Sequence, residues 1–277
     1  MKKISYMIFY EKKVTIVTGA SSGIGKASAI EFAKQGSNLV IVARDEKRLI
    51  DTESQCKIFG VEVLVVKADV SKEVDCKRII NSTIKKFDRI DVLVNNAGIS
   101  MRALFGNTDL SVLKKVMDVN FWGTVYCTKF ALPYLLKTNG SVVGVISTAG
   151  FRGLPGRTAY SASKFAINGF LETLRTEYLK TGLHVLIVAP GFTSSNIRVT
   201  ALTGDGSKQG CTPKDESRMM TPEGVAKKLV RSVKKQKKYL IMTSMGRAVY
   251  VLNKFFPRSM DTLVYWYFSR ENDSPFK

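Results

Sequence analysis

The sequence predicts an α/β fold in which a parallel β-sheet is covered by helices on both faces. Short, apolar, β-branched runs alternate along the 277-residue chain with longer segments of helical periodicity. The apolar runs are continuous, as is typical of strands that are buried on both faces. The first run is followed by a glycine-rich turn and then by a helical pattern, which together indicate a strand–turn–helix unit.

The predicted elements alternate strictly between strand and helix. The strands are expected at residues 14–17, 39–42, 61–66, 92–94, 142–146, 185–188 and 239–242. The helices are expected at residues 25–35, 45–59, 71–87, 111–136, 159–180 and 222–235. With 45% hydrophobic residues, a chain of this length buries one large core. We therefore expect residues 1–242 to form one domain and residues 243–277 to form a basic and aromatic extension.

The turn after the first predicted strand, at residues 18–25, has the sequence TGASSGIG. Closely spaced glycines let the backbone approach an anion, and free N–H groups at the start of a helix favour negative charge. The turn is therefore expected to bind the pyrophosphate of a dinucleotide. A Walker-type phosphate loop is excluded, because no Gly-Lys-Ser/Thr closes the segment. The candidate residues in this turn are Gly19, Ser21, Ser22, Gly23, Ile24 and Gly25.

Tyr160 and Lys164 are four residues apart in the sequence YSASK, and Ser147 ends an apolar run upstream of them. Residues at i and i+4 share one face of a helix. A free tyrosine, with a pKa of about 10, is a poor base near neutral pH, but a neighbouring ammonium lowers that pKa. The Ser147 hydroxyl could orient the reacting oxygen. Either these side chains exchange a proton with a carbonyl or carbinol oxygen, or Tyr160 and Lys164 share a solvated helix by chance.

Together with the Asn95-Asn96-Ala97-Gly98 turn, these motifs resemble those of the short-chain dehydrogenase/reductase family. The resemblance extends from about residue 13 to about residue 242. Its motifs, in chain order, are TGASSGIG, Asp69-Val70, NNAG, Asn120, Ser147, YSASK and Pro190-Gly191. It implies a single Rossmann-type, doubly wound sheet of seven parallel strands in the order 3-2-1-4-5-6-7, with helices on both faces. It also implies an NAD(P)-dependent enzyme that acts on a CH–OH or C=O group.

The resemblance implies four catalytic residues. Tyr160 would donate a proton to the carbonyl oxygen, or accept one in the reverse oxidation. Lys164 would hold a cofactor ribose and lower the pKa of the tyrosine, and Ser147 would polarise the carbonyl. Asn120, in the middle of a long helix, would link Lys164 to a chain of water molecules. The alternative for Asn120 is an ordinary polar residue of that helix.

The resemblance also implies contacts with the cofactor at three further places. Asp69 would contact the adenine with Val70 packed against it, unless Asp69 instead caps the next helix. The NNAG turn would lie beside a ribose. The loop after the sixth strand would hold the nicotinamide, with Thr193 or Ser195 bonded to its carboxamide. The cofactor-binding residues here are Asp69, Val70, Asn96, Ala97, Gly98, Pro190, Gly191 and Thr193, together with Tyr160 and Lys164.

The residue that reads the adenosine ribose is expected at the end of the second strand, about 20 residues after the glycine turn. An acidic residue there would accept a hydrogen bond from the ribose 2′-OH and repel a 2′-phosphate. Here Ala43 takes that place and is followed by Arg44, whose guanidinium can bind a phosphate. The sequence therefore favours NADP(H) over NAD(H). NAD(H) is the alternative if Asp45 reaches the ribose instead of capping the next helix.

Three loops, at residues 99–105, 150–157 and 192–220, are expected to close over the nicotinamide. Their apolar residues suit a lipid-like, steroid-like or aromatic ketone, or else they pack on one another. These residues are Met101, Leu104, Phe105, Phe151, Leu154, Phe192 and Ile197. An alternative activity is that of a 3-oxoacyl-carrier-protein reductase, whose acidic carrier would dock on a basic surface. The other alternative is a non-catalytic nucleotide-binding scaffold.

Neither a metal site nor nucleic-acid binding is expected. The cysteines Cys56, Cys76, Cys127 and Cys211 have no paired or metal-like spacing, so reduced thiols are expected. His184 opens an apolar strand and is expected to be structural. No interleaving of aromatic and basic residues marks a platform for stacked bases.

The formal net charge is +20, and residues 225–277 carry twelve Lys/Arg but three Asp/Glu. No apolar stretch there reaches the ~18–20 residues of a spanning helix, and residues 1–13 have too short an apolar core for a signal peptide. We expect a cytoplasmic protein. Its C-terminal segment either contacts an anionic membrane peripherally or forms a solvated basic face, with the aromatic tail packed on the domain or on a sister subunit. The resemblance implies a homodimer or homotetramer formed through the helices at residues 111–136 and 159–180.

Overall fold

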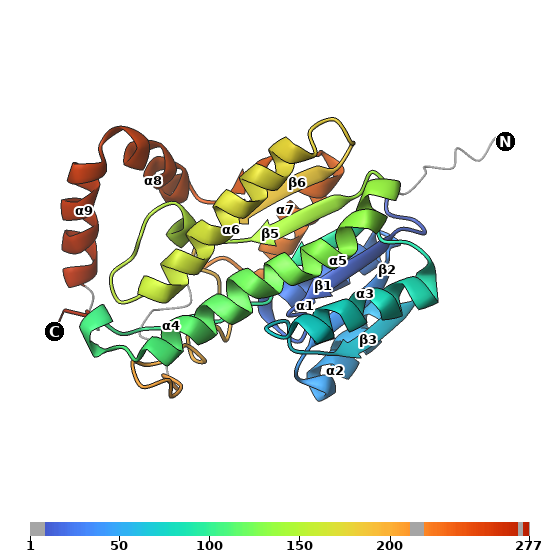
Figure 1. Ribbon diagram of the computed structural model, residues 1–277, viewed down its shortest axis with the longest axis horizontal. Helices are drawn as coiled ribbons and strands as arrows, with labels where there is room; N and C mark the ends of the chain where they lie inside the picture. The colour runs from blue at the N-terminus through green and yellow to red at the C-terminus, as the bar shows by residue number, and fades with distance from the viewer. Residues whose placement is uncertain (1–8, 211–218, 271–273, 277) are drawn as a thin grey trace.

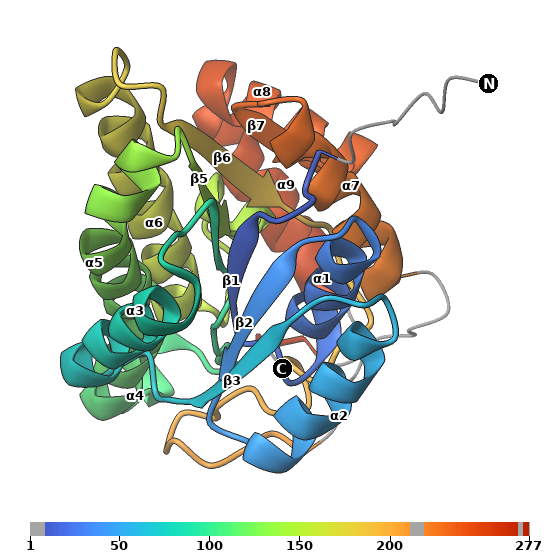
Figure 2. The same cartoon turned by 90° about the vertical axis from the view of Figure 1, so that its right-hand side faces the viewer.

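The computed structural model describes residues 9–210, 219–270 and 274–276 of the chain. Its core is a sheet of seven parallel strands in the order β3-β2-β1-β4-β5-β6-β7 (Figures 1 and 2). The strands are β1 (Val14–Thr18), β2 (Asn38–Ala43), β3 (Val63–Lys67), β4 (Val92–Asn95), β5 (Ser141–Val145), β6 (His184–Ala189) and β7 (Tyr239–Ile241). The predicted fold class and strand order are confirmed.

Two layers of helices cover the sheet, one on each face (Figure 2). One layer holds α1 (Gly23–Lys34), α2 (Glu46–Lys57) and α7 (Pro222–Lys234), and the other holds α3 (Glu73–Phe87), α4 (Leu110–Met117), α5 (Gly123–Lys137) and α6 (Thr158–Glu177). Successive side chains of a strand point to opposite faces. In β2, Leu39 and Ile41 therefore join the core beneath the first layer, while Val40 and Val42 join the core beneath the second. Burial on both faces explains why the strands read as continuous apolar runs.

The direction in which the sheet grows reverses at β1. β2 and β3 are added on one side of β1, and β4 to β7 are added on the other. The turns that leave the carboxyl ends of β1 and β4 therefore diverge. Open α/β sheets bind their ligands at such a switch point, and here the two turns are TGASSGIG and NNAG.

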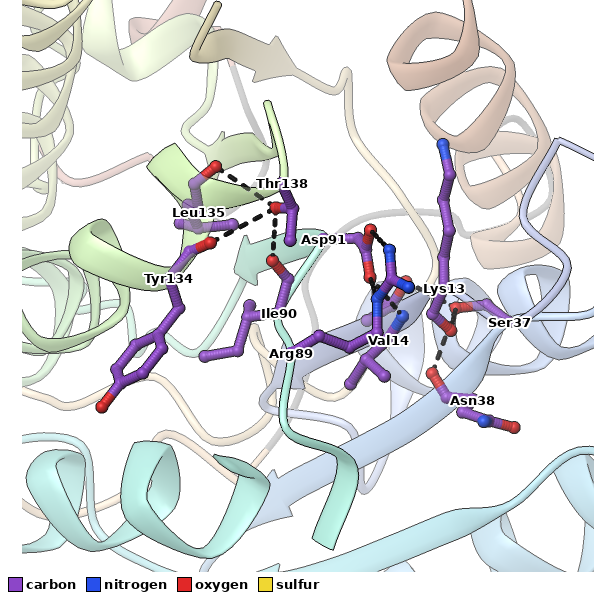
Figure 3. A network of polar contacts seen from close by, with 11 residues as sticks. Lys13, Val14, Ser37, Asn38, Arg89, Ile90, Asp91, Tyr134, Leu135 and Thr138 are labelled. Carbon is purple, nitrogen blue, oxygen red and sulfur yellow. Dashed lines mark hydrogen bonds and ion pairs between the residues drawn. The ribbon is translucent and has the colours of Figure 1, made fainter. Parts of the chain in front are cut away.

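The opposite, amino-terminal edge of the sheet is closed by a polar network (Figure 3). The buried Asp91 carboxylate accepts a hydrogen bond from the backbone N–H of Val14 (2.9 Å) and two from the Arg89 guanidinium (2.8 and 2.7 Å). Thr138 Oγ1, at the end of α5, donates to the carbonyl oxygen of Ile90 (2.7 Å). These bonds fix the starts of β1 and β4 relative to α5.

The segment predicted to be helical at residues 111–136 is helical throughout, but not as a single α-helix. α4 leads into a π-helical turn, η2 (Asp118–Trp122), before α5 begins at Gly123. π turns inside α-helices occur frequently at functional sites, and this one contains Asn120. Two short 3-10 turns, η1 (Phe105–Asn107) and η3 (Thr148–Gly150), lie in the loops after β4 and β5.

The C-terminal extension forms two helices, α8 (Ser244–Phe255) and α9 (Pro257–Ser269), for which the sequence analysis assigned no element. Figure 1 shows them at the carboxyl end of the sheet, beside the start of α6. The basic run at residues 234–238 lies instead between the end of α7 and the start of β7, at the amino-terminal edge. Across residues 9–210, 219–270 and 274–276, every helix is too short or too polar to cross a bilayer.

Candidate active site

The glycine-rich turn brings three chain segments into close contact. Gly19 has a φ of 68°, and a Cβ atom there would lie 2.9 Å from Ala97 Cα. A Cβ atom at Gly25 would lie 2.1 Å from the carbonyl oxygen of Gly19. α1 begins at Gly23, and its N-cap residue Ser22 makes no capping hydrogen bond with its side chain. The first N–H groups of α1 are therefore left to an anion, so the turn fits the pyrophosphate of a dinucleotide.

Thr18 connects the two turns at the switch point, and the sequence analysis did not identify it as a site residue. Its Oγ1 accepts hydrogen bonds from the backbone N–H groups of Asn96 and Ala97 (both 3.0 Å) and donates to the carbonyl oxygen of Val94 (3.2 Å). Asn96 Nδ2 returns a bond to the carbonyl oxygen of Thr18 (2.9 Å). The available signal was a hydroxyl residue immediately before the first glycine of the turn.

Asn120 and Lys164 both lie close to Gly98. Lys164 is buried, and its Nζ donates to the carbonyl oxygen of Val145 (2.9 Å) at the end of β5. Asn120 Oδ1 accepts from the backbone N–H of Ile99 (2.8 Å). A Cβ atom at Gly98 would lie 3.1 Å from Asn120 Oδ1 and 3.5 Å from Lys164 Nζ. Glycine at position 98 therefore brings the backbone of the NNAG turn close to both polar groups.

Tyr160 and Ser147 approach from α6 and from the end of β5. Burial raises the pKa of the Tyr160 phenol, while a hydrogen bond with the Ser147 side chain and the charge of Arg157 act in the opposite direction. The Ser147 hydroxyl also accepts a hydrogen bond from the N–H of Ala149 (3.2 Å), where Ser147 caps η3. The structure thus brings the predicted serine and tyrosine together.

The sequence analysis predicted that the Lys164 ammonium lowers the pKa of Tyr160, and in this structure the net direction is the reverse. The lysine Nζ lies 5.6 Å from the centre of the tyrosine ring. Desolvation of the lysine lowers its own pKa to about 8. Burial of the phenol therefore outweighs the charges around it, and the charge that opposes burial belongs to Arg157.

The predicted adenine-binding residues lie at the end of β3. Asp69 Oδ1 accepts hydrogen bonds from the N–H of Ser71 (3.0 Å) and from its hydroxyl (2.8 Å). The side chain of Val70 is buried against Gly123 of α5, where a Cβ atom would lie 2.8 Å from Val70 Cγ2. One oxygen of Asp69 therefore closes a local turn with Ser71, but Asp69 does not cap the next helix as the alternative proposed, because the N-cap residue of α3 is Lys72.

At the end of β2, Arg44 and Asp45 have different surroundings. Arg44 is exposed. The Asp45 carboxylate accepts a hydrogen bond from the N–H of Arg48 (3.1 Å) as the N-cap of α2 and pairs with the Arg48 guanidinium (3.4 Å). The carboxylate that could have contacted a ribose is thus bound to α2.

The loop after β6 begins with Pro190 and Gly191. A Cβ atom at Gly191 would lie 2.4 Å from Thr243 Cγ2, so this turn packs directly on the start of α8. The buried Thr193 hydroxyl donates to the carbonyl oxygen of Gly191 (3.0 Å). Ser195 lies against the glycine turn, since its Cβ atom is 3.2 Å from where a Cβ of Gly23 would be. Of the two candidate residues for the carboxamide, Ser195 therefore lies at the glycine turn, while the Thr193 hydroxyl is bonded within its own loop.

The apolar loop residues divide into two groups. Met101 packs with Val112 and Leu202, and Phe151 packs on the Tyr250 ring of α8 at 4.8 Å. Phe105 and Phe192 are exposed. A cavity of about 420 Å³ lies farther out, between the loop at residues 152–155, α6 and α9, and neither Tyr160 nor Ser147 lines it. Met101 and Phe151 therefore pack against other residues of the protein, whereas Phe105 and Phe192 remain exposed.

The cysteines and His184 lie away from this site. Cys56, Cys76 and Cys127 are buried free thiols, and Cys211 lies outside the described residues. His184 opens β6 at the amino-terminal edge, where its Nδ1 contacts Ser141 Oγ (3.0 Å) and its Nε2 contacts the carbonyl oxygen of Lys237 (2.8 Å). These contacts support the structural role that was expected for His184.

Comparison with known proteins agrees with this geometry. A family model described as short chain dehydrogenase matches residues 13–205. The chain is 38% identical over 256 residues to an 11-beta-hydroxysteroid dehydrogenase A of Sesamum indicum, covering 90% of this chain and 73% of that protein. It is 40% identical over 250 residues to an 11-beta-hydroxysteroid dehydrogenase-like 4A of Arabidopsis thaliana, covering 88% and 81%.

A solved structure also resembles the fold. The alcohol dehydrogenase of the archaeon Thermococcus sibiricus, complexed with 5-hydroxy-NADP, superposes with a TM-score of 0.71 at 26% identity, covering 84% of this chain and 97% of that one. The fold, the paired turns at the switch point and the family match agree. The chain belongs to the short chain dehydrogenase family and is an NAD(P)-dependent oxidoreductase.

Proposed function

We propose that the protein uses NADP(H) to reduce the ketone of an apolar, lipid-like or steroid-like compound, or to oxidise the corresponding secondary alcohol. The observation that carries this proposal is the convergence of Ser147, Tyr160, Lys164 and Asn120 beside the NNAG turn. In the direction of reduction, the bound cofactor supplies a hydride to the carbonyl carbon. The protein supplies the proton and orients the carbonyl oxygen.

Tyr160 donates the phenolic proton to the carbonyl oxygen, which becomes the hydroxyl of the product. The Ser147 hydroxyl orients that oxygen and, through its hydrogen bond to Tyr160, favours the phenolate left behind. Lys164 lies beside Gly98, where it can hold a cofactor ribose, and Asn120 fixes the backbone of Ile99 next to it. General acid–base help of this kind contributes about 10²–10⁴-fold to the rate.

Two observations support NADP(H). Arg44 is exposed where the second strand ends, and the Asp45 carboxylate is bound to the N-terminus of α2. The structural relative from Thermococcus sibiricus was solved with an NADP derivative. Arg44→Ala is expected to weaken NADPH binding about tenfold while leaving NADH binding unchanged, because only the 2′-phosphate contact is lost. Equal weakening of both cofactors in fluorescence titrations would count against this assignment.

The names of the relatives support a steroid-like substrate, and Phe105 and Phe192 are exposed in two of the loops that are expected to close over the nicotinamide. The carrier-protein alternative is less well supported. Its acidic carrier would dock on a basic surface, and the basic run at residues 234–238 lies at the edge of the sheet opposite to Tyr160, although Arg157 is close to the tyrosine. Activity on a carrier-linked ketone without activity on free ketones would favour that alternative.

The test of the function is a panel of free apolar ketones with NADPH, comparing wild type with Tyr160→Phe and with a control, Tyr178→Phe. Tyr178 follows the last residue of α6, the helix that carries Tyr160 at its other end. We expect Tyr160→Phe to bind NADPH normally and to lose turnover by at least about 100-fold, and Tyr178→Phe to resemble wild type. Equal turnover of wild type and Tyr160→Phe would refute the assigned acid.

We also propose that α8 and α9 contact an anionic membrane from the cytoplasmic side. They expose apolar and aromatic side chains, among them Phe255 (72% exposed) and Trp266 (48%), with Arg247, Lys254 and Arg258 interspersed. Tryptophan and tyrosine favour membrane–water interfaces, and each nearby Lys or Arg contributes about 1 kcal/mol at an anionic surface. Flotation with phosphatidylserine vesicles at low salt should recover wild type and lose Phe255→Asp. A change of oligomeric state in that variant, without vesicle binding by wild type, would assign the surface to a sister subunit instead.

We propose a homodimer or homotetramer as the assembled form. The exposed Trp122 and Phe165 lie on the two helices through which pairing was expected, the first on η2 and the second on α6. Sedimentation analysis of wild type against Phe165→Glu tests this, with dissociation as the expected result. An unchanged mass would remove α6 from the interface.

A further inference from the structure

The segment that joins Ser147 to Tyr160 is held from outside the Rossmann domain. Asn253, on α8, makes two hydrogen bonds to it with a single amide group. Its Nδ2 donates to the carbonyl oxygen of Phe151 (3.0 Å), and its Oδ1 accepts from Arg152 Nη1 (3.0 Å). The Arg152 guanidinium also pairs with Asp261 of α9. α8 is therefore attached to two consecutive residues of the catalytic segment, and α9 to the second of them.

Apolar packing reinforces this attachment. The ring of Phe151 is buried and meets the Tyr250 ring of α8 edge-on, with 4.8 Å between the ring centres. At Gly246, near the start of α8, a Cβ atom would lie 2.9 Å from Thr148 Cγ2. The Arg152 side chain is only 16% exposed, so its bond to Asn253 of α8 is partly shielded from water, whereas its partner on α9, Asp261, is 74% exposed. Shielded, charge-assisted bonds are stronger than exposed ones.

The held residues are only four and five positions after Ser147 and are joined to it by a closed turn. The N–H of Gly150 donates to the carbonyl oxygen of Ser147 (2.9 Å), and the N–H groups of Phe151 and Arg152 both donate to Thr148 (3.0 and 3.1 Å). A turn closed in this way moves as a unit. A shift of Phe151 is therefore passed to Ser147 and to its hydrogen bond with Tyr160.

We propose that Asn253 is a positioning residue for the reaction: by holding Phe151 and Arg152, it fixes the turn that presents Ser147 to Tyr160. The C-terminal helices are then part of the framework of the active site and not an appendage of it. This inference rests on the proposed function, because it assigns Asn253 to the same ketone-reducing site. Asn253 touches neither the reacting oxygen nor the glycine turn, so it acts through Ser147 alone.

The experiment compares Asn253→Ala with wild type and with Met245→Ala, a matched control at an exposed position of the same helix. The full-length chain is used throughout. We expect Asn253→Ala to lower kcat for a free ketone about 10–100-fold, the effect of misplacing a reacting group by about 1 Å. NADPH affinity should stay within about twofold, because the cofactor turn is untouched. Loss of the Ser147 bond should also raise the apparent pKa of the oxidation profile.

A second variant keeps the inference testable if Asn253→Ala does not fold. Asn253→Asp has nearly the same shape and still accepts from Arg152, but it cannot donate to the Phe151 carbonyl and should show the same loss of kcat. Arg152→Lys, which retains the charge, should be affected less than Arg152→Ala. A kcat and pH profile equal to wild type in folded Asn253→Asp would overturn the inference, even if the melting temperature fell.

The two proposals fail in different ways. If wild type reduces ketones and Tyr160→Phe does not, the proposed function stands, and normal turnover of Asn253→Asp removes only the positioning role. If wild type itself binds NADPH but reduces no ketone in the panel, the proposed function fails first. NADPH titration of all variants separates a lost cofactor site from a lost catalytic geometry.

Discussion

Asn120 Nδ2 donates a 2.9 Å hydrogen bond to Ser163 Oγ, and this contact joins the π turn to the helix that carries Tyr160 and Lys164. Ser163 Oγ in turn donates to the carbonyl oxygen of Tyr160 (2.8 Å). The buried Asn120 amide also pairs with both the N–H and the C=O of Ile99. One amide group therefore connects the NNAG turn, the long helix and α6.

Removing this amide should cost stability. Asn120→Ala is expected to lower the free energy of unfolding by about 2–4 kcal/mol, because the N–H and C=O groups of the partly buried Ile99 lose their partner. Ser163→Ala keeps the Ile99 pair and should cost about 1 kcal/mol. Urea denaturation measures both values. Equal losses in the two variants would contradict the view that Ile99 is the main partner.

The π turn at Asn120 explains why the sequence could predict the helix and not its interruption. The apolar spacing of residues 111–136 reports only which face is buried. The amide contacts Ile99, 21 residues away, and Ser163, 43 residues away, and no local pattern carries such tertiary bonds. The position of Asn120 near Lys164 was foreseen by family resemblance. Its role as a junction became visible only with both helices in place.

Thr18 offers a test of how the two turns at the switch point cooperate. Thr18→Val removes the acceptor shared by the N–H groups of Asn96 and Ala97. We expect NADPH binding to weaken about tenfold, or about 1.4 kcal/mol, because the NNAG turn loses its fixed distance from the glycine turn. Thr18→Ser retains the hydroxyl and should bind as wild type does. Fluorescence titration measures both affinities. Normal NADPH binding by a folded Thr18→Val would show that the Thr18 hydroxyl is not needed to hold the two turns together.

The pKa values of Tyr160 and Lys164 depend on how deeply the two side chains are buried, which the sequence alone does not show. The spacing of Tyr160 and Lys164 correctly placed them on one helix, but it did not show that both are desolvated. Burial reverses the expected direction of the tyrosine pKa and lowers that of the lysine. The helices α8 and α9 were not predicted, although α8 is amphipathic. Their place beside the turn at Phe151 depends on tertiary contacts such as the hydrogen bond from Asn253.

Arg157 is expected to influence the pKa of Tyr160, the proposed acid. Its charge holds the pKa of Tyr160 below the value that burial alone would set, and its Nη1 donates to Ser100 Oγ (3.1 Å). In Arg157→Gln the pKa should rise, so the pH at which alcohol oxidation reaches half its maximum should move upward. Arg157→Lys retains the charge and should stay near wild type. The log of kcat/KM against pH gives the answer, and an unchanged profile in Arg157→Gln would rule out this electrostatic role.

Lys164 should make the stability of the free protein depend on alkaline pH. Burial lowers its pKa from 10.5 to about 8 in the folded state. Between these two values the unfolded chain binds the proton and the folded chain does not, so the free energy of unfolding rises with pH. Below about pH 8 the folded state carries the full penalty of a buried charge. A difference of this size corresponds to about 3 kcal/mol.

Lys164→Met removes that titration and the bond to the Val145 carbonyl. The stability of wild type minus that of Lys164→Met should therefore increase from pH 8 to pH 10.5 by up to about 3 kcal/mol. Lys129→Met, at an exposed position of α5, controls for the loss of one positive charge. Urea denaturation at a series of pH values, without cofactor, measures the three proteins. Parallel curves for wild type and Lys164→Met would show that burial does not lower the pKa of the lysine.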